Sequence, residues 1–268
     1  MKNILDYPDP AKRRRLRRIF REDGKTVIIP MDHGVSIGPV KGLENMKRLV
    51  EELSKGGVDA VVVHKGWAKL LDFSSMGLII HGSAGTDLSP DRLRKTACAT
   101  PLEALALGAD GFSLHVNVGS ETDYEQISFL ARSSRACSRL GLPLLAMMYP
   151  RGAKIQDEHS PKEVSHAARI GVELGADVVK TNYTGSPESF KLVVESSHIP
   201  VVIAGGPKTS STREFLKMVS DAISAGAAGV SIGRNVFQHE EPRKMAEALK
   251  AIVHEGASVD YAMEVVEG

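Results

Sequence analysis

A lysine stands inside one of the most apolar segments of the chain. Lys180 lies within residues 178–181 (VVKT), a run with the character of a buried β-strand. Burying an unpaired ammonium is costly, and burial favours the neutral amine, which is the nucleophile that condenses with ketones. We therefore predict that Lys180 forms a Schiff base. In the two alternatives, the aliphatic part of the Lys180 side chain carries the amine out of the barrel mouth to solvent, or the amine pairs with Asp32. Lys65 is a rival for the same role, but it closes its strand rather than lying within it.

Two further side chains that can transfer protons follow apolar runs. Asp32 comes directly after residues 26–31 (TVIIPM) and suits a proton acceptor or an anchor for substrate hydroxyls; the alternative is a loop-stabilising or helix-capping aspartate. Tyr149 follows residues 144–148 (LLAMM) and suits a general acid or base, or else packs against a loop. For His33 a structural hydrogen bond and a catalytic role are both open.

Glycine pairs and two arginines indicate an anion site. Gly205 and Gly206 follow one late apolar run, and Gly233 and Arg234 follow the next. Glycines let the backbone approach a ligand closely, and free amides together with an arginine fork bind phosphate. Arg151 could hold a carboxylate, phosphate or carbonyl group, with a surface ion pair as the alternative.

Eight short apolar runs recur along the chain with amphipathic helical stretches between them. Nearly all positions within the runs are apolar rather than alternating, which is typical of parallel strands covered on both faces. Eight such strands alternating with helices predict a single closed (β/α)8 TIM barrel; an open doubly wound sheet is the alternative, without support from a dinucleotide-binding glycine motif. The eight runs are residues 26–31, 60–64, 78–81, 111–116, 144–148, 178–181, 201–204 and 229–232.

Five glycine-containing junctions separate predicted helices from the strands that follow them. Each is expected to end a helix with a left-handed glycine, as in Gly-Ala-Asp-Val at 175–178. Helices are predicted at residues 43–55, 124–140, 161–174, 214–225 and 242–253. Residues 1–24 are predicted to form an N-terminal helical extension, and residues 25–268 the catalytic barrel. In the former, Leu16, Ile19 and Phe20 form an apolar stripe that can dock the helix.

The overall charge argues against nucleic acid or a membrane surface as a partner. The formal net charge is +1, so no global field attracts polyanions. The basic run at residues 12–18 is interpreted as the solvated face of a short helix rather than a nucleic-acid or membrane patch. Cys98 and Cys137 are expected to be small buried or half-buried residues. No metal-ligand spacing, signal sequence or long apolar run is recognisable, so we expect a cytoplasmic protein without a bound metal.

With these residues assembled, the chain resembles the archaeal-type class I aldolases over nearly its whole length. Five ordered motifs carry the resemblance: MDHGVSxGP (31–39), YPRG (149–152), VKTxYTG (179–185), GGPK (205–208) and GRNxFQ (233–238). Within that family the chain is most similar to a branch of transaldolase-type synthases. The fructose-bisphosphate aldolase branch usually has HGIEHGP near the first strand and a tryptophan shortly before the tyrosine; here Val35, Ser36, Ile37 and Met147 stand at those positions.

The resemblance implies a role for each motif residue. Lys180 would form the Schiff base, Tyr149 would donate a proton and Asp32 would accept one. No cofactor is implied, because a protonated Schiff base is itself an electron sink that stabilises the carbanion as an enamine. The substrate contacts implied are Asp32, His33, Gly34, Val35, Ser36, Tyr149, Pro150, Arg151, Lys180, Gly205, Gly206, Gly233 and Arg234.

The implied partners are two small molecules and further copies of the chain. Lys180 would condense with a phosphorylated keto-sugar, 6-deoxy-5-ketofructose 1-phosphate, and the retained ketone fragment would be joined to L-aspartate semialdehyde. The family implies a homo-oligomer. The alternatives are a class I fructose-1,6-bisphosphate aldolase and, from another class, a catalytically silent barrel that serves as a regulatory or assembly subunit.

Overall fold

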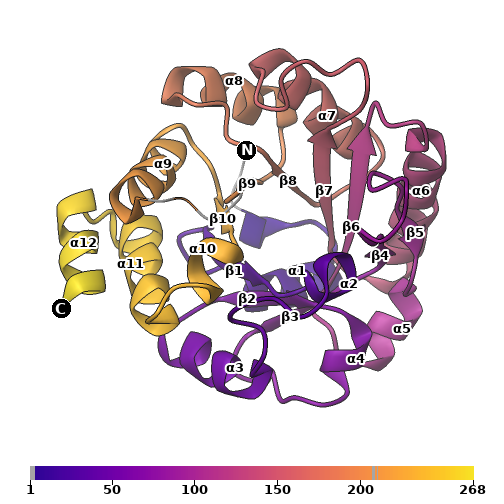
Figure 1. Ribbon diagram of the computed structural model, residues 1–268. Coiled ribbons are helices and arrows are strands. Elements are labelled where there is room, and N and C mark those ends of the chain that lie inside the picture. Colours follow the sequence, from indigo (N-terminus) through magenta and orange to yellow (C-terminus); the bar gives the residue numbers. More distant parts are fainter. Residues whose placement is uncertain (1–3, 207–208, 210) are drawn as a thin grey trace.

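Eight parallel strands close into a barrel in the computed structural model, which describes residues 4–206, 209 and 211–268. Each strand pairs with the next barrel strand along the chain, and the last, β10, pairs with β1. The strands lie at the centre of Figure 1 with helices around them. The prediction of a (β/α)8 barrel is confirmed, and every one of the eight apolar runs forms a barrel strand. The strands are β1 (Thr26–Pro30), β2 (Ala60–Val63), β3 (Gly77–His81), β6 (Gly111–Val118), β7 (Leu144–Pro150), β8 (Val178–Thr181), β9 (Val201–Ala204) and β10 (Gly229–Ser231).

Alternate residues of each strand face the barrel interior, because side chains along a strand point to opposite faces. Ile28, Val62 and Ile79 pack inside the barrel, whereas their neighbours belong to the cluster between the strands and the outer helices. On β8, Val178 belongs to the interior cluster, so the same alternation turns Lys180 inward two residues later. The strand period alone therefore aims the lysine into the barrel.

Amphipathic helices cover the outside of the barrel. The longest, α6, ends at Gly141, which has a positive φ of 59° and begins the turn into β7. The helix α12 lies outside α9 and α11 (Figure 1). The helices are η1 (Ile4–Asp6), α1 (Pro10–Ile19), α2 (Gly34–Ile37), α3 (Met46–Lys55), α4 (Lys65–Ala68), α5 (Pro101–Ala106), α6 (Asp123–Leu140), α7 (Pro161–Glu173), α8 (Pro187–Ser197), α9 (Thr212–Ser224), α10 (Arg234–Phe237), α11 (Pro242–Glu255) and α12 (Val259–Glu267).

The helix α1 closes the end of the barrel at which the strands begin. Its Leu16 and Ile19, together with Phe20, pack against the interior residues of the strands, as the apolar stripe predicts. One part of the prediction for this helix is wrong: Lys12 is not on a solvated face but is 4% exposed. Its amine lies 2.8 Å from a carboxylate oxygen of Asp177, since a buried ammonium requires a charged partner.

Two further ion pairs attach α1 and the segment after it to the start of the barrel strands. Arg18 pairs with Asp110 and Arg21 with Asp59. The three acceptor carboxylates occupy equivalent places, directly before β2, β6 and β8, and each also accepts a backbone N–H from a neighbouring strand. Two residues of the basic run at 12–18, Lys12 and Arg18, therefore hold α1 to the barrel.

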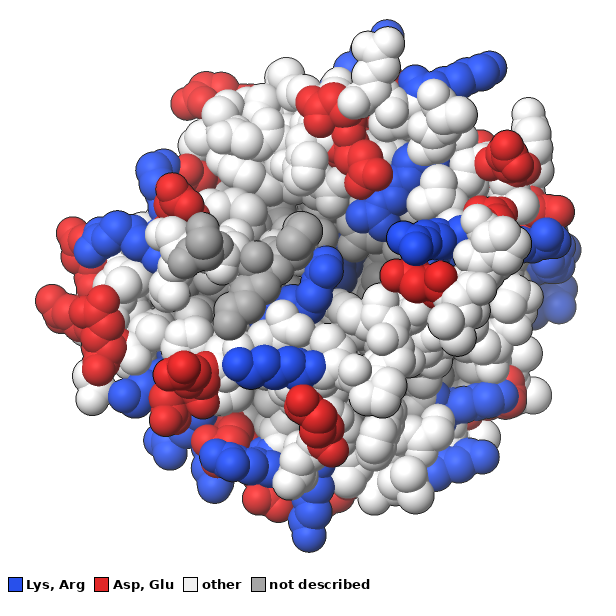
Figure 2. All heavy atoms as spheres, in the orientation of Figure 1, with Lys and Arg blue, Asp and Glu red and all other residues white. Residues whose placement is uncertain are grey.

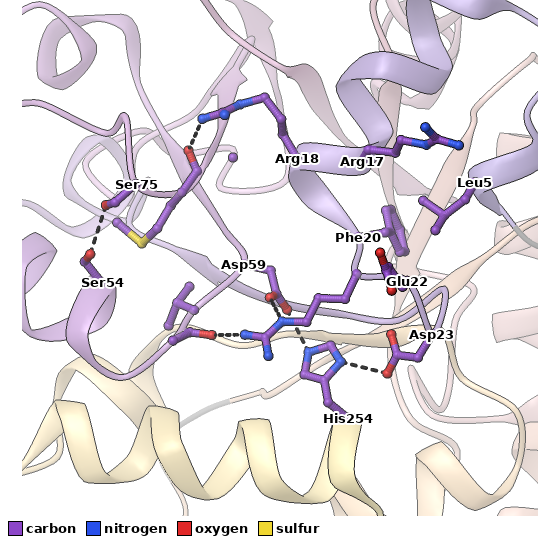
Figure 3. Close-up of a pocket in the computed structure, with 15 residues that line it drawn as sticks. Leu5, Arg17, Arg18, Phe20, Glu22, Asp23, Ser54, Asp59, Ser75 and His254 are labelled. Carbon is purple, nitrogen blue, oxygen red and sulfur yellow. Dashed lines mark hydrogen bonds and ion pairs between the residues drawn. The ribbon is translucent and has the colours of Figure 1, made fainter.

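A cavity of about 980 Å³ also lies at this end and is lined by residues of α1 and the strand starts. Figure 3 shows His254 between Asp23 and Asp59, with hydrogen bonds of 2.8 Å to each. Asp59 also pairs with Arg21. The charged groups that line this cavity therefore pair largely with one another. The reactive residues predicted from the sequence lie elsewhere.

A short hairpin between β3 and β6 has no counterpart in the predicted elements. Its strands are β4 (Ser83–Ala84) and β5 (Thr96–Ala97), which pair in antiparallel fashion outside the barrel. Two residues per strand are too few to give a recognisable pattern, and polar residues fill the connecting loop. The hairpin lies at the end of the barrel where β3 finishes, so it can contribute to the mouth.

Several smaller predictions can be compared with the structure. The five junction glycines all have positive φ, from 59° at Gly141 to 97° at Gly226, so the predicted left-handed helix ends are confirmed. The helix α7 begins at Pro161, where the predicted helix at residues 161–174 begins. Pro207 and Lys208 of the GGPK motif lie outside the described residues. No helix among the described residues is long and apolar enough to cross a membrane.

Candidate active site

A cavity of about 350 Å³ opens at the carboxyl ends of the barrel strands. Figure 2 looks onto this face, which is hollowed near its centre, with lysine and arginine side chains visible at the hollow. The carboxyl ends of the strands are where barrels of this kind carry their reactive groups. Of the residues predicted from the sequence, those that line the cavity are Asp32, His33, Ser36, Tyr149, Arg151, Lys180, Gly205, Gly206, Gly233 and Arg234.

Three predicted contact residues do not line the cavity. Gly34 and Val35 lie in the short helix α2, and the Val35 side chain is 42% exposed. Pro150 follows Tyr149 on β7, so the alternation along the strand turns it away from the interior. A continuous sequence motif therefore predicts more contact residues than line the cavity, because only some of its residues face inward.

Lys180 is enclosed by the barrel, and no described residue lies at bonding distance from its amine. The residue is 7% exposed, and among the described residues no hydrogen bond or ion pair reaches its amine. Burial lowers the pKa of Lys180 to about 8, with further lowering by the charges of Arg151 and Arg234 and opposition from Asp32. A substantial fraction of the amine is therefore neutral near neutral pH, as nucleophilic attack on a ketone requires.

Tyr149 stands on the strand next to Lys180. Met147 of β7 pairs in register with Lys180, and Tyr149 is the next inward-facing residue along the same strand. Its ring packs between His115, at 4.9 Å between ring centroids, and the Arg151 guanidinium, at 4.6 Å from the ring centroid. Burial raises the pKa of the Tyr149 hydroxyl well above its ordinary value, despite the opposing charge of Arg151. Tyr149 therefore keeps its proton and can donate it.

Asp32 follows β1 and lies among histidines. Its carboxylate oxygens are 3.6 Å from Nδ1 of His33 and 3.6 Å from Nε2 of His81. Burial by itself raises the pKa of Asp32, but positive charge on His81, His33 and Lys180 outweighs burial and holds the pKa below its ordinary value. Asp32 is consequently a carboxylate at neutral pH and favours the protonated form of the neighbouring lysine.

The histidines themselves are uncharged at neutral pH. Burial lowers the pKa of His81 to about 4, although Asp32 opposes the shift. Burial also lowers the pKa of His33 below its ordinary value. These imidazoles therefore carry a positive charge only in acid, and near pH 7 the positive charge that acts on Asp32 is that of Lys180. His33 Nδ1 is buried, and no described residue hydrogen-bonds it, so of the two roles left open for His33 the structural hydrogen bond is not present at this atom.

The loops after β9 and β10 supply backbone rather than side chains to one wall of the cavity. Gly206 has φ of 63°, and a Cβ placed there would meet nothing within 4 Å, so its backbone is open to the cavity. At Gly233 a Cβ would lie 2.7 Å from the Pro30 carbonyl oxygen, which excludes any side chain. Arg234 lies beside them, with its Nε buried and unpaired among the described residues. The open backbone at Gly206 and the unpaired Nε of Arg234 form a place suited to an anion.

Sequence reasoning missed several residues of the cavity. His115 and Asn117 on β6 face the cavity and hydrogen-bond each other at 2.8 Å. Period-two alternation along the predicted strand could have found them. Lys95 and Asp87 also line the cavity but come from the unpredicted hairpin, so no local signal placed them there. Arg151, predicted either to bind substrate or to form an ion pair, lines the cavity and also pairs with Glu158 at 2.8 Å.

The lowered pKa of Lys180 gives an expected pH dependence. With a pKa of about 8, roughly one amine in a hundred is neutral at pH 6, one in ten at pH 7 and half at pH 8. The initial rate at which a ketone substrate is trapped on the enzyme by borohydride should thus rise about tenfold from pH 6 to pH 7 and level off above about pH 9. Mass spectrometry of quenched samples measures this rate. A rate that still climbs tenfold between pH 9 and pH 10 would instead indicate an ordinary lysine.

The closed parallel barrel with a buried lysine, tyrosine and carboxylate at its mouth places the chain among the (β/α)8-barrel enzymes. Residues 26–239 match the sequence pattern of the DeoC/LacD family aldolases. The chain is an aldolase-type enzyme and belongs to this family, which confirms the resemblance carried by the five motifs.

Proteins similar to this chain include both synthases and aldolases. A protein of Archaeoglobus fulgidus named 2-amino-3,7-dideoxy-D-threo-hept-6-ulosonate synthase 1 is 50% identical, over 95% of each chain. A Streptomyces griseus protein named 2-amino-4,5-dihydroxy-6-oxo-7-(phosphonooxy)heptanoate synthase is 43% identical, over 91% of this chain and 90% of its own. An archaeal fructose-1,6-bisphosphate aldolase, solved with its catalytic lysine bound to a carbinolamine intermediate, is 34% identical with a TM-score of 0.85, over 91% of this chain and 99% of its own.

Proposed function

We propose that the chain is a transaldolase-type synthase. It joins a ketone fragment of 6-deoxy-5-ketofructose 1-phosphate to L-aspartate semialdehyde, giving 2-amino-3,7-dideoxy-D-threo-hept-6-ulosonate. The observation that carries the reaction type is Lys180, a buried amine without a bonding partner among the described residues, which opens into the same cavity as Tyr149 and Asp32. The 50% identity to the Archaeoglobus fulgidus synthase supports the choice of substrates.

In the first half of the reaction, Lys180 acts as the nucleophile. Its neutral amine adds to the methyl-ketone carbon, and Tyr149 donates a proton to the departing hydroxyl, so that water leaves and a protonated Schiff base remains. Asp32 accepts the proton of the sugar hydroxyl at the bond to be broken. The electrons of that carbon–carbon bond move into the iminium, which gives an enamine on Lys180 and releases hydroxypyruvaldehyde phosphate.

The second half reverses these proton transfers with a different aldehyde. The enamine carbon attacks the aldehyde of L-aspartate semialdehyde, and the proton held by Asp32 passes to the new hydroxyl. Water then adds to the Schiff base, and the product departs as a ketone while Tyr149 recovers its proton. Gly205, Gly206, Gly233 and Arg234 bind the phosphate of the donor through amides and the guanidinium.

The second candidate is a class I fructose-1,6-bisphosphate aldolase. The 34% identity to the archaeal aldolase that carries a covalent lysine intermediate favours it. The two candidates share the chemistry of Lys180 and differ in the ketose that is cleaved. The residues that differ from the aldolase branch, Val35, Ser36, Ile37 and Met147, favour the synthase; Met147 lines the cavity directly beside Lys180 in the strand register.

Mass spectrometry of the borohydride-reduced protein with each ketose distinguishes the two functions. The diketo sugar is expected to leave a three-carbon fragment on Lys180, and L-aspartate semialdehyde added before reduction should discharge it as the seven-carbon product. Preferential labelling by fructose 1,6-bisphosphate, with triose phosphate released, would establish the aldolase instead. Absence of any adduct at Lys180 with either ketose would leave the silent barrel as the remaining interpretation.

A further inference from the structure

The β4–β5 hairpin reaches the cavity from outside the barrel and is fixed in place there. The Asp87 backbone N–H donates to the Ser36 carbonyl oxygen at 2.9 Å. On the other side of the loop, the Leu93 carbonyl oxygen accepts hydrogen bonds from Asn117 Nδ2 at 2.7 Å and Gln126 Nε2 at 3.1 Å. The loop is thus held between the helix after β1 and the end of β6, so the side chains that it presents to the cavity have defined positions.

Lys95 is a cation of this hairpin that lines the cavity and is not paired with any described residue. Its amine lies 2.8 Å from the point where a Cβ of Gly85 would stand, so the glycine makes room for it. Among the described residues, no carboxylate or carbonyl oxygen lies at bonding distance from this amine. By contrast, Arg151 is paired with Glu158 and Lys65 with Glu103. Burial and the charge of Arg151 lower the pKa of Lys95, which has no described carboxylate at ion-pair distance.

The cavity therefore has two cationic regions. Arg234 and the glycine loops lie at β9 and β10, and the charge of Arg234 acts on Lys180. Lys95 lies across the barrel mouth from them, near the ends of β3 and β6. There its charge lowers the pKa values of His81 and His115. The first region has the amides suited to phosphate, which leaves Lys95 for a second anion.

The second region also holds a carboxylate. Asp87 lines the same cavity as Lys95, and its charge partly offsets the lowering of the Lys95 pKa. Two cations and one carboxylate of this short hairpin line the cavity, namely Arg92, Lys95 and Asp87. Opposite charges on one hairpin match an α-amino acid, which carries an ammonium and a carboxylate on the same carbon. The names of the two synthases similar to this chain both describe a product with a 2-amino group and a carboxylate.

We propose that the β4–β5 hairpin is the binding subsite for the acceptor aldehyde, where Lys95 binds the carboxylate of L-aspartate semialdehyde and Asp87 binds its ammonium. This inference rests on the proposed function and assigns the acceptor specificity to residues outside the barrel strands. The aldehyde carbon of this acceptor is only three bonds from its carboxylate carbon, so the anchored end fixes the aldehyde near the enamine.

Lys95→Met tests the carboxylate contact, because methionine keeps an apolar stem over Gly85 and removes the charge. The KM for L-aspartate semialdehyde should rise tenfold to a hundredfold, the range for a lost hydrogen bond between charged groups. The KM for succinate semialdehyde, which lacks only the amino group, should rise equally, whereas 3-aminopropanal, which lacks only the carboxylate, should react as with the unaltered enzyme.

Asp87→Asn should show the opposite selectivity between these two aldehydes. Lys154→Met, which removes an exposed lysine from the loop after β7, is the control for general charge effects.

Borohydride trapping of the donor fragment on Lys180 is measured first in every variant, without acceptor. Unchanged donor trapping shows that Lys95→Met is folded and that the proposed function holds. If the acceptor KM then stays unchanged, or if the KM for the phosphorylated donor rises as much as that for the acceptor, the assignment of Lys95 is wrong while the function stands. If the unaltered enzyme shows no trapping at all, the proposed function itself fails.

Discussion

Lys180→Ala is expected to lower turnover by on the order of 10⁶-fold, the scale on which loss of an enzymatic nucleophile acts. The alanine cannot form the Schiff base, and the other described lysine that lines the cavity, Lys95, comes from the β4–β5 hairpin rather than from the strand beside Tyr149. Borohydride trapping of the ketone should also disappear, because the adduct has no attachment point. Turnover with both aldehydes present and intact mass after reduction measure the two effects.

The control for this substitution is Lys65→Ala. Lys65 is the rival lysine of the sequence, but it lies after β2, is engaged by Glu103 at 2.7 Å and does not line the cavity. Trapping and turnover should therefore persist in Lys65→Ala. A Lys180→Ala protein that still gains the mass of the ketose fragment would show that another amine carries the reaction.

Tyr149→Phe is expected to slow turnover by roughly 10²- to 10⁴-fold, the range for loss of a positioned general acid. Phenylalanine keeps the ring between His115 and Arg151, so the local packing survives and only the proton donor is lost. The adduct should still form on Lys180, more slowly, because the amine and its pKa depend mainly on burial and on the charges around it. Single-turnover rates of adduct formation and of aldehyde release separate the two effects.

The comparison of the two variants is more informative than either alone. If Tyr149→Phe lost the adduct as completely as Lys180→Ala does, Tyr149 would be needed to build or hold the site rather than to donate a proton. If its rate of turnover were unchanged, the proton would have to come from another group or from water. Retained trapping with slowed aldehyde release or exchange is the pattern that the proposed roles require.

Much of the site follows from short-range features of the sequence. The apolar runs define parallel strands, and the alternation along a strand then sends Lys180, Tyr149 and Asp32 to the interior at the ends of their strands. The glycines after β9 and β10 were likewise expected at the cavity, since barrel loops at these strands often bind phosphate. For these residues, knowing the strand and its end was enough to place the side chain.

Other features depended on how distant segments meet. The pairing of Lys12 with Asp177 joins residues far apart in sequence, and only closure of the barrel brings the start of β8 beneath α1. The charge state of Asp32 is likewise set by His81 and Lys180, which stand on separate strands.

The sequence by itself determined the fold class and was enough to predict a Schiff-base role for Lys180, because strand periodicity and the cost of burying an amine are local properties. Only the tertiary structure decided which groups surround that lysine and which residues complete the cavity. Lys95 reaches the mouth from a hairpin of two-residue strands, whose path is set by hydrogen bonds to the helix α2 after β1 and to β6. No local preference encodes such a path, since its energy comes from contacts that exist only in the closed barrel.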